Sequence, residues 1–256
     1  MIERMHLLVR FFLLTSLAIA AGAAHADGLS DLKTALQSLS GQQAIKATIT
    51  AKTQHRQGEG PEATTDVGAA SLAVEDSAQG LQLQFAPDML ARLQAEKQAR
   101  ESDALAKTPT SQGLGALGYA EIRAMTSAAD SLKGELARAT FKNEVTDTWN
   151  GRPARLLNFD LGPGKLRAQD QKYIKKTEGS LQIWIAADGT PLESRSQMKL
   201  SGRALMVISF ETILNAKVIY QRQGDRLIAT RRESQNSASG AGEKGEDKNE
   251  LSLVLR

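Results

Sequence analysis

The sequence contains no cysteine, and this absence limits how the chain can be stabilised and anchored. It excludes disulfides, and it also excludes the lipid-modified cysteine that tethers a secreted lipoprotein to a membrane. An ordinary apolar core must therefore stabilise the fold. A chain of this length can build one, because a domain of similar size removes about 70% of its unfolded surface from water.

Aromatic residues and histidine are also scarce. Phe, Trp and Tyr make up 4% of the chain, so the core must consist mainly of Leu, Ile, Val, Ala and Met. Beyond residue 26 the only histidine is His55, which cannot form a multi-histidine metal site by itself. No local pattern places a nucleophile and an orienting acid beside it, so we expect a surface or strand-end residue rather than a catalytic one. The net charge of +3 does not indicate nucleic-acid binding.

A long apolar run occurs only at the start of the chain. Arginines precede the apolar segment 11–21, and small residues occupy the −3 and −1 positions of a cleavage site after Ala26. This pattern predicts a cleaved signal peptide over residues 1–26 and a single periplasmic domain over residues 27–256. The alternative is an uncleaved anchor, but the run is shorter than the ~20 residues that a spanning helix needs.

Hydrophobic periodicity predicts that the domain begins with a helix and continues as an antiparallel meander. Leucines recur at helical spacing over residues 29–39. Over residues 45–53 the period changes to two, which predicts a strand with one polar face. Turn signals then separate two further strands, predicted over residues 64–75 and 81–85.

The segment 87–138 is predicted to form a helical hairpin set between strands. Pro87 suits the first position of a helix, and residues 108–118 read as the loop between the two helices. The glycines of this loop match the dinucleotide-binding pattern, but that pattern needs a strand before it. The second helix carries one apolar stripe, formed by Ile122, Met125, Ala129, Leu132 and Leu136.

Strands joined by short turns return after residue 140. Asn150-Gly151 is the strongest hairpin signal, because both turn positions need positive φ. Asp188-Gly189 and Gly224-Asp225 indicate further hairpins, and residues 234–249 read as a loop before the last strand. With about ten strands and no regular alternation of strand and helix, we predict an α+β fold with one large antiparallel sheet, which should curl.

Three phrases carry a resemblance to a known family: "LSDLKTALQSLSGQQAIKATITAKTQ", "TDTWNGRPARLLNFDL" and "SLQIWIAADGTPLESRSQMKL". Together with the order of elements, they resemble the periplasmic lipoprotein-carrier family. The resemblance implies a half-open β-barrel whose concave face is covered by helices. It also implies an apolar ligand, such as an acyl chain or a lipidated client, held between the sheet and the helices.

Small residues on the inward face of one predicted strand bear on this cavity. Ser194 and Ser196 stand where large apolar residues are expected, which leaves volume above the sheet. Because protein interiors are close-packed, either the apolar helical stripe or a ligand must fill that volume. If a ligand does, we expect its site to be lined by Ile183, Ile185, Leu192, Met198, Met125 and Leu132.

A basic segment offers a second candidate surface, formed by Lys165, Arg167, Lys172, Lys175 and Lys176. Clustered cations favour anionic lipid headgroups or an acidic partner surface, so peripheral membrane contact is one interpretation. Solvated linker charge is the alternative.

Two hypotheses about function follow, and neither involves catalysis, a metal or a cofactor. The first is a periplasmic protein that binds a lipidic or apolar client, as a lipid carrier or an envelope chaperone would. The second is a structural or adaptor module of the cell envelope, whose own helices seal the cavity and whose surface docks another protein. An enzyme would require acids gathered around His55.

Overall fold

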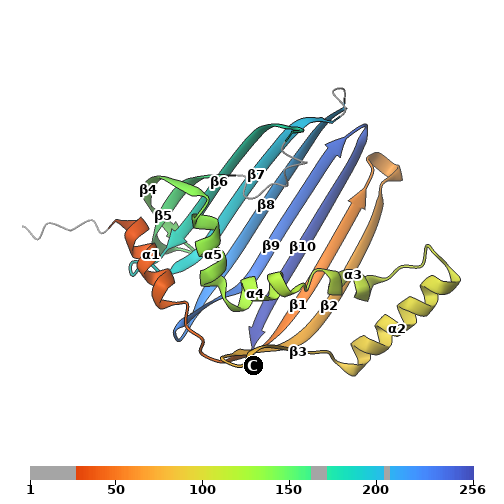
Figure 1. The fold of residues 1–256 in the computed structure, drawn as a ribbon, viewed down its shortest axis with the longest axis horizontal. Helices are drawn as coiled ribbons and strands as arrows, with labels where there is room; N and C mark the ends of the chain where they lie inside the picture. The colour runs from red at the N-terminus through yellow and green to blue at the C-terminus, as the bar shows by residue number, and fades with distance from the viewer. Residues whose placement is uncertain (1–26, 163–171, 205–207) are drawn as a thin grey trace, which may run out of the picture.

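The computed structural model describes residues 27–162, 172–204 and 208–256, so the predicted signal peptide, residues 1–26, lies outside the described residues. Figure 1 shows one large sheet with helices packed across one of its faces. The predicted fold class is confirmed: the protein is α+β, with a curved antiparallel sheet that is not closed into a barrel.

Ten antiparallel strands form this sheet in the part of the chain that the structure describes. They are β1 (Ile45–Gln57), β2 (Thr64–Ser77), β3 (Gly80–Gln84), β4 (Ala139–Trp149), β5 (Arg152–Leu161), β6 (Ile174–Ile185), β7 (Pro191–Ala204), β8 (Ile208–Gln223), β9 (Arg226–Gly240) and β10 (Glu243–Leu255). Their order is β3-β2-β1-β10-β9-β8-β7-β6-β5-β4. The first strand therefore pairs with the last, and β3 and β4 are the edges.

The helices differ in number from the prediction. They are α1 (Gly28–Ser38), α2 (Pro87–Ser102), α3 (Pro109–Gly115), α4 (Tyr119–Thr126) and α5 (Ala128–Leu136). The segment 87–138 thus forms four short helices instead of a two-helix hairpin. The second predicted helix is interrupted at Ser127, whose backbone (φ −134°, ψ 59°) leaves the helical region. The predicted loop before it contains α3.

The predicted turns are confirmed, whereas the last predicted loop is wrong. Asn150 and Gly151 both have positive φ, at 49° and 76°, as their hairpin requires. Residues 234–249 belong to the paired strands β9 and β10, which turn at Ala241 and Gly242. Because β8 and β1 pair with these strands on either side, their backbone groups are satisfied without an apolar sequence pattern.

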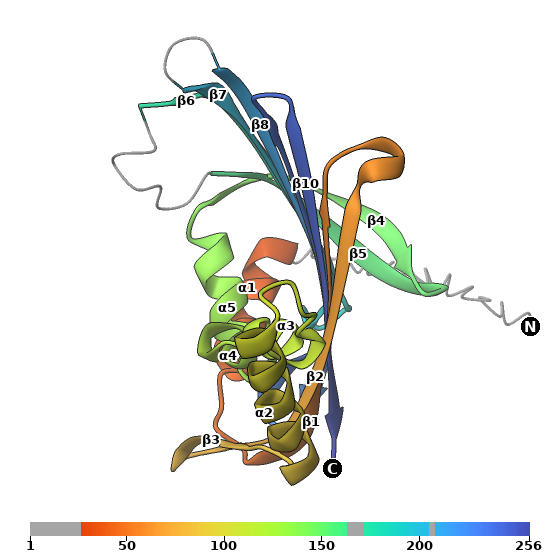
Figure 2. The same cartoon turned by 90° about the vertical axis from the view of Figure 1, so that its right-hand side faces the viewer.

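The core lies between the helices and one face of the sheet, which we call the helix side (Figure 2). The opposite face is the helix-free face. Ile122, Met125 and Leu132 of α4 and α5 are at most 1% exposed, and they share the core with Ile183 and Ile185 of β6. The leucines of α1 complete this packing. The apolar stripe predicted from the sequence therefore lies against the sheet.

A buried ion cluster fixes α4 on the sheet. Asp76 of β2 and Arg226 of β9 are only 1% and 2% exposed. Arg226 Nη1 donates to Asp76 Oδ2 at 2.8 Å, and Arg123 Nη1 of α4 donates to the same oxygen at 2.8 Å. Arg226 also donates to the backbone carbonyl of Thr126 at 3.3 Å. One carboxylate thus joins two strands and a helix.

Close backbone contact fixes α3 on β2. A Cβ atom placed on Gly113 would lie 2.3 Å from the backbone carbon of Ala69 and 2.5 Å from the nitrogen of Ala70. Gly113 is one of the glycines that match the dinucleotide pattern, and its role in this structure is close helix-to-strand packing. Only glycine permits this approach without displacing backbone.

Replacing Gly113 with alanine should lower the free energy of unfolding by about 1–3 kcal/mol, because the added methyl group overpacks this contact. Urea denaturation followed by tryptophan fluorescence would measure the loss. Gly115→Ala is the matched control, since it lies in the same helix and a Cβ there would meet nothing within 4 Å. Equal stability of the two variants would contradict the packing role.

Candidate functional site

The six residues expected to line an apolar cavity lie on two faces of the sheet. Five belong to the core on the helix side and are at most 6% exposed: Ile183, Ile185, Met198, Met125 and Leu132. Leu192 instead packs against a separate cluster of Ala154, Leu156 and Trp184 on the helix-free face. A β-bulge in β7, opposite Trp184 and Ile185, turns Leu192 away from the helices. The assignment of Leu192 to the inward face is therefore wrong.

The structure also accounts for the small residues of β7. Ser194 is 3% exposed, and its hydroxyl shares a hydrogen bond of 2.7 Å with the hydroxyl of Tyr220 on β8. Burial raises the pKa of Tyr220, so this hydroxyl stays protonated. Ser196 is half-buried and lies beside Ala216 of β8. A tyrosine of the neighbouring strand thus satisfies the buried serine.

A polar layer lies where α4 and α5 meet β9. Arg232 of β9 pairs with Glu121 of α4 at 3.3 Å. Burial raises the pKa of Glu135 on α5, while the charges of Arg232 and Arg138 partly oppose this shift. Titratable groups are therefore placed between the helices and the sheet, where their charge affects how well the helices pack.

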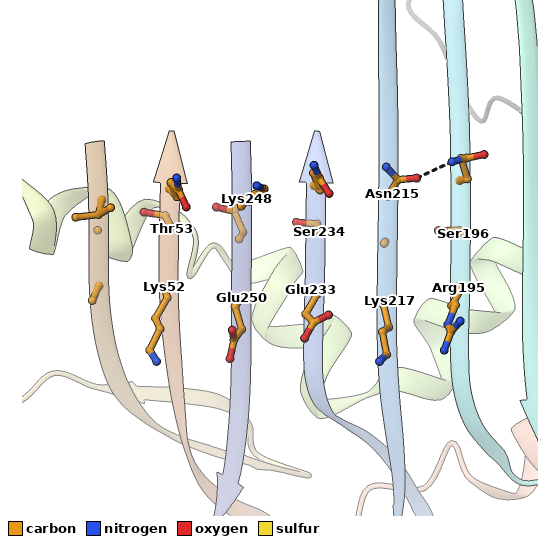
Figure 3. A pocket seen from close by; sticks show the side chains of 18 of the residues that line it. Lys52, Thr53, Arg195, Ser196, Asn215, Lys217, Glu233, Ser234, Lys248 and Glu250 are labelled. Atoms are coloured by element: carbon orange, nitrogen blue, oxygen red, sulfur yellow. Dashed lines mark hydrogen bonds between the residues drawn. The ribbon is translucent and has the colours of Figure 1, made fainter. Parts of the chain in front are cut away.

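A groove with a volume of about 980 Å³ lies on the helix-free face. Figure 3 views it with the helices behind the sheet. It crosses β2, β1, β10, β9, β8, β7 and β6, and two adjacent rows of side chains line it. The strand register aligns these rows: Lys52 lies opposite Glu250, and Lys217 lies opposite both Glu233 and Arg195.

Charged residues form the first row of the groove. Its basic members are Lys52, Lys217 and Arg195, and its acidic members are Glu233 and Glu250 (Figure 3).

The acids of this row have closer ion-pair partners than its lysines have. Arg231, outside the groove, pairs with Glu233 at 2.7 Å and with Glu250 at 3.3 Å. Lys217 has a contact of 3.8 Å with Glu193, and Lys52 has no ion-pair partner in the described part of the chain. The positive charge of this row is therefore available to a ligand.

Side-chain amides dominate the second row. They come from four strands: Gln54, Gln235, Asn215 and Gln197. Gln197 Nε2 donates to Asn215 Oδ1 at 3.0 Å. Gln182, in the first row, donates to Asn158 of β5 at 3.1 Å. Each amide offers both donors and an acceptor, so the row can exchange its internal hydrogen bonds for bonds to a ligand.

Both tryptophans of the chain lie beside the β6 end of the groove. Trp149 Nε1 donates to Glu193 Oε2 at 3.0 Å, and Trp184 Nε1 donates to Asp147 Oδ2 at 2.8 Å. Arg195 lies 4.8 Å from the Trp184 ring centre and donates to Glu193 Oε1 at 2.6 Å. Glu193 is 4% exposed, and its hydrogen bond holds Arg195 at the groove margin.

The described members of the predicted basic segment do not line the groove. Three of its members are described, and all are exposed: Lys172, Lys175 and Lys176. Lys176 pairs with Glu178 at 2.6 Å. Lys165 and Arg167 lie outside the described residues. A shared headgroup site for these cations stays a prediction.

His55 lies near the end of β1 and is half-exposed, with its Nδ1 2.6 Å from Asp247 Oδ1 of β10. Asp66 of β2 is its register partner on the other side. In the described ranges no three His, Asp or Glu side chains gather closely enough to hold a metal ion.

No protein-family model, curated protein or solved structure matches the chain. Among the helices that the structure describes, none has both the length and the apolar content needed to cross a membrane.

The groove residues were not predicted from the sequence. The available signal was the polar half of each alternating strand, such as Lys52 and Gln54 in β1. That signal indicates a solvent-facing surface strand by strand. It does not show that polar positions of six strands fall in adjacent rows, because alignment depends on register.

Glu135→Gln should change how stability depends on pH. The carboxyl has a higher pKa in the folded chain, so the folded state binds more protons and the free energy of unfolding falls as pH rises above 4.5. The variant lacks this loss. The melting temperature of the variant minus that of the wild type should therefore be larger at pH 7 than at pH 4. Exposed Glu101→Gln is the control, and matching profiles for both variants would contradict the assignment.

Proposed function

We propose that the mature chain is a non-catalytic binding protein of the periplasm, which uses the helix-free groove as its binding surface. This proposal develops the hypothesis of an envelope adaptor whose own helices seal the helix side. The predicted signal peptide supports the location. The resemblance to periplasmic lipoprotein carriers supports an envelope role, while the proposed binding face differs from the one that the resemblance implies.

One observation carries the proposal: the predicted cavity on the helix side is filled, whereas the helix-free face has an open groove. On the helix side, the predicted cavity residues Ile183, Ile185 and Met125 are 0% exposed, because the helices pack on them. On the helix-free face, a groove of about 980 Å³ is open to solvent. Ligand sites have volumes of roughly 300–1,000 Å³, so the groove is large enough for a substantial ligand.

The chemistry of the groove suits binding. Its amides, ammonium groups and carboxylates donate and accept hydrogen bonds, and Glu193 and Trp149 hold Arg195 beside Trp184. Packing on a scaffold of paired strands keeps such groups in place, which lowers the entropy that binding costs. We therefore infer a preorganised polar surface without a catalytic role.

A second candidate is the apolar client of the first hypothesis, bound where the sheet extends beyond the helices. Leu214 of β8 favours it. This leucine lies on the helix side, opposite Met198, and is 39% exposed. A lipidic client could cover it without displacing α4 or α5.

Adjacent positions of β8 distinguish the two candidates, because consecutive residues of a strand face opposite sides. The chain has no cysteine, so Asn215→Cys and Leu214→Cys each create a unique labelling site. Each immobilised variant is modified with bulky maleimide-poly(ethylene glycol) and exposed to envelope extract, and bound material is identified by mass spectrometry. Modification at position 215 should abolish retention, whereas modification at 214 should leave it unchanged.

The opposite pattern, with lipid or lipoprotein lost only after modification at 214, would overturn the proposal in favour of the apolar client. Retention that survives both modifications would contradict both candidates. Unmodified Asn215→Cys and Leu214→Cys proteins control for effects of the substitutions themselves.

A further inference from the structure

The dimensions of the groove favour an extended ligand. It crosses seven neighbouring strands, and strand spacings of about 4.8 Å give it a length of roughly 29 Å. Its floor is the paired backbone of the sheet, with side chains in rows on either side (Figure 3). A compact small molecule would contact only a fraction of this length, whereas a linear polymer could contact all of it.

The hydrogen-bonding groups of the groove match a ligand rich in hydroxyls. Gln54, Gln235, Asn215 and Gln197 each offer two N–H donors and a carbonyl acceptor. A hydroxyl also both donates and accepts, so neighbouring hydroxyls can pair with one amide. Polysaccharides present such hydroxyls repeatedly along a chain.

The charges of the groove add a preference for acidic groups. Two acidic residues line it, Glu233 and Glu250, and Arg231 pairs with both. Against them stand four basic residues: Lys52, Lys217, Arg195 and Lys248. Lys52 has no ion-pair partner among the described residues, and Lys217 is 3.8 Å from its nearest acid. These lysines lie on β1 and β8, separated by β10 and β9, so they could bind carboxylates at separate points of one chain.

Other linear polymers fit the groove less well. A peptide that adds to a sheet needs a free strand edge, but the strands at the centre of the groove are paired on both sides. Single-stranded nucleic acid is bound by stacking on aromatic side chains, and among the described lining residues there are none. Acyl chains would desolvate the lysines and amides without replacing their hydrogen bonds.

We propose that the helix-free groove binds a linear polysaccharide that carries carboxylate groups, with its chain running across the strands. The amide row binds the sugar hydroxyls, while Lys52 and Lys217 bind the carboxylates. This inference rests on the proposed function, because it takes the groove as the binding surface. It adds the chemical class of the ligand.

The test compares three polymers on the mature protein by isothermal titration calorimetry. Polygalacturonate carries hydroxyls and carboxylates, dextran carries hydroxyls alone, and poly-aspartate carries carboxylates alone. Polygalacturonate should bind most tightly, and its affinity should fall as NaCl is added, because salt screens the exposed lysines.

Paired variants then locate the site. Lys52→Gln with Lys217→Gln should weaken polygalacturonate binding by about tenfold, since each exposed ion pair contributes modestly. Gln197→Ala with Asn215→Ala should weaken it without changing the salt dependence. The matched control, Lys199→Gln with Lys244→Gln, removes the same charge outside the groove and should leave affinity unchanged.

Each contrary outcome has a distinct meaning. If poly-aspartate binds as tightly as polygalacturonate, the groove is only a cationic surface and the inference fails. Equal binding of dextran removes the requirement for carboxylates and also overturns it. If polygalacturonate does not bind, while modification at position 215 still blocks retention of envelope material, the inference fails and the proposed function stands.

Discussion

The closed half of the molecule depends on the buried carboxylate of Asp76. It accepts hydrogen bonds from Arg226 on β9 and Arg123 on α4, so one side chain joins two strands and a helix. Removing one partner of a buried ion pair typically costs about 3–5 kcal/mol, because the remaining charge stays buried without compensation. This cluster fixes α4 on the sheet, and the apolar stripe of α4 and α5 is thereby kept in the core.

Packing of the helices on the sheet is the reason that we propose the opposite face as the binding surface. Residues such as Met125 and Ile183 are fully buried where the helices pack, so a ligand there would have to displace them. The helix-free face requires no such displacement. The β4–β5 hairpin lies on that side of the sheet in Figure 2, and Trp149 near its tip reaches Glu193. Glu193 in turn accepts a hydrogen bond from Arg195, which lines the groove.

Much of the fold could be predicted because its signals are local. Asn150-Gly151 requires a hairpin, and the alternation that begins at Ile45 requires a strand with one buried face. The failures arise where tertiary contacts override local signals. The small and charged residues of 234–249 are extended because β8 and β1 pair with them, and a bulge moves Leu192 to the other face.

The sequence by itself determined the antiparallel α+β fold class, the positions of most strands and turns, and the apolar helical stripe, because each depends on periodicity or turn chemistry within a short segment. Only the tertiary structure decided that the stripe fills the space over the sheet. It alone brought Lys52, Lys217 and the amides of four strands into adjacent rows. Register and curvature arise from pairing between distant segments, and a polar residue in one strand carries no information about its neighbours in the others.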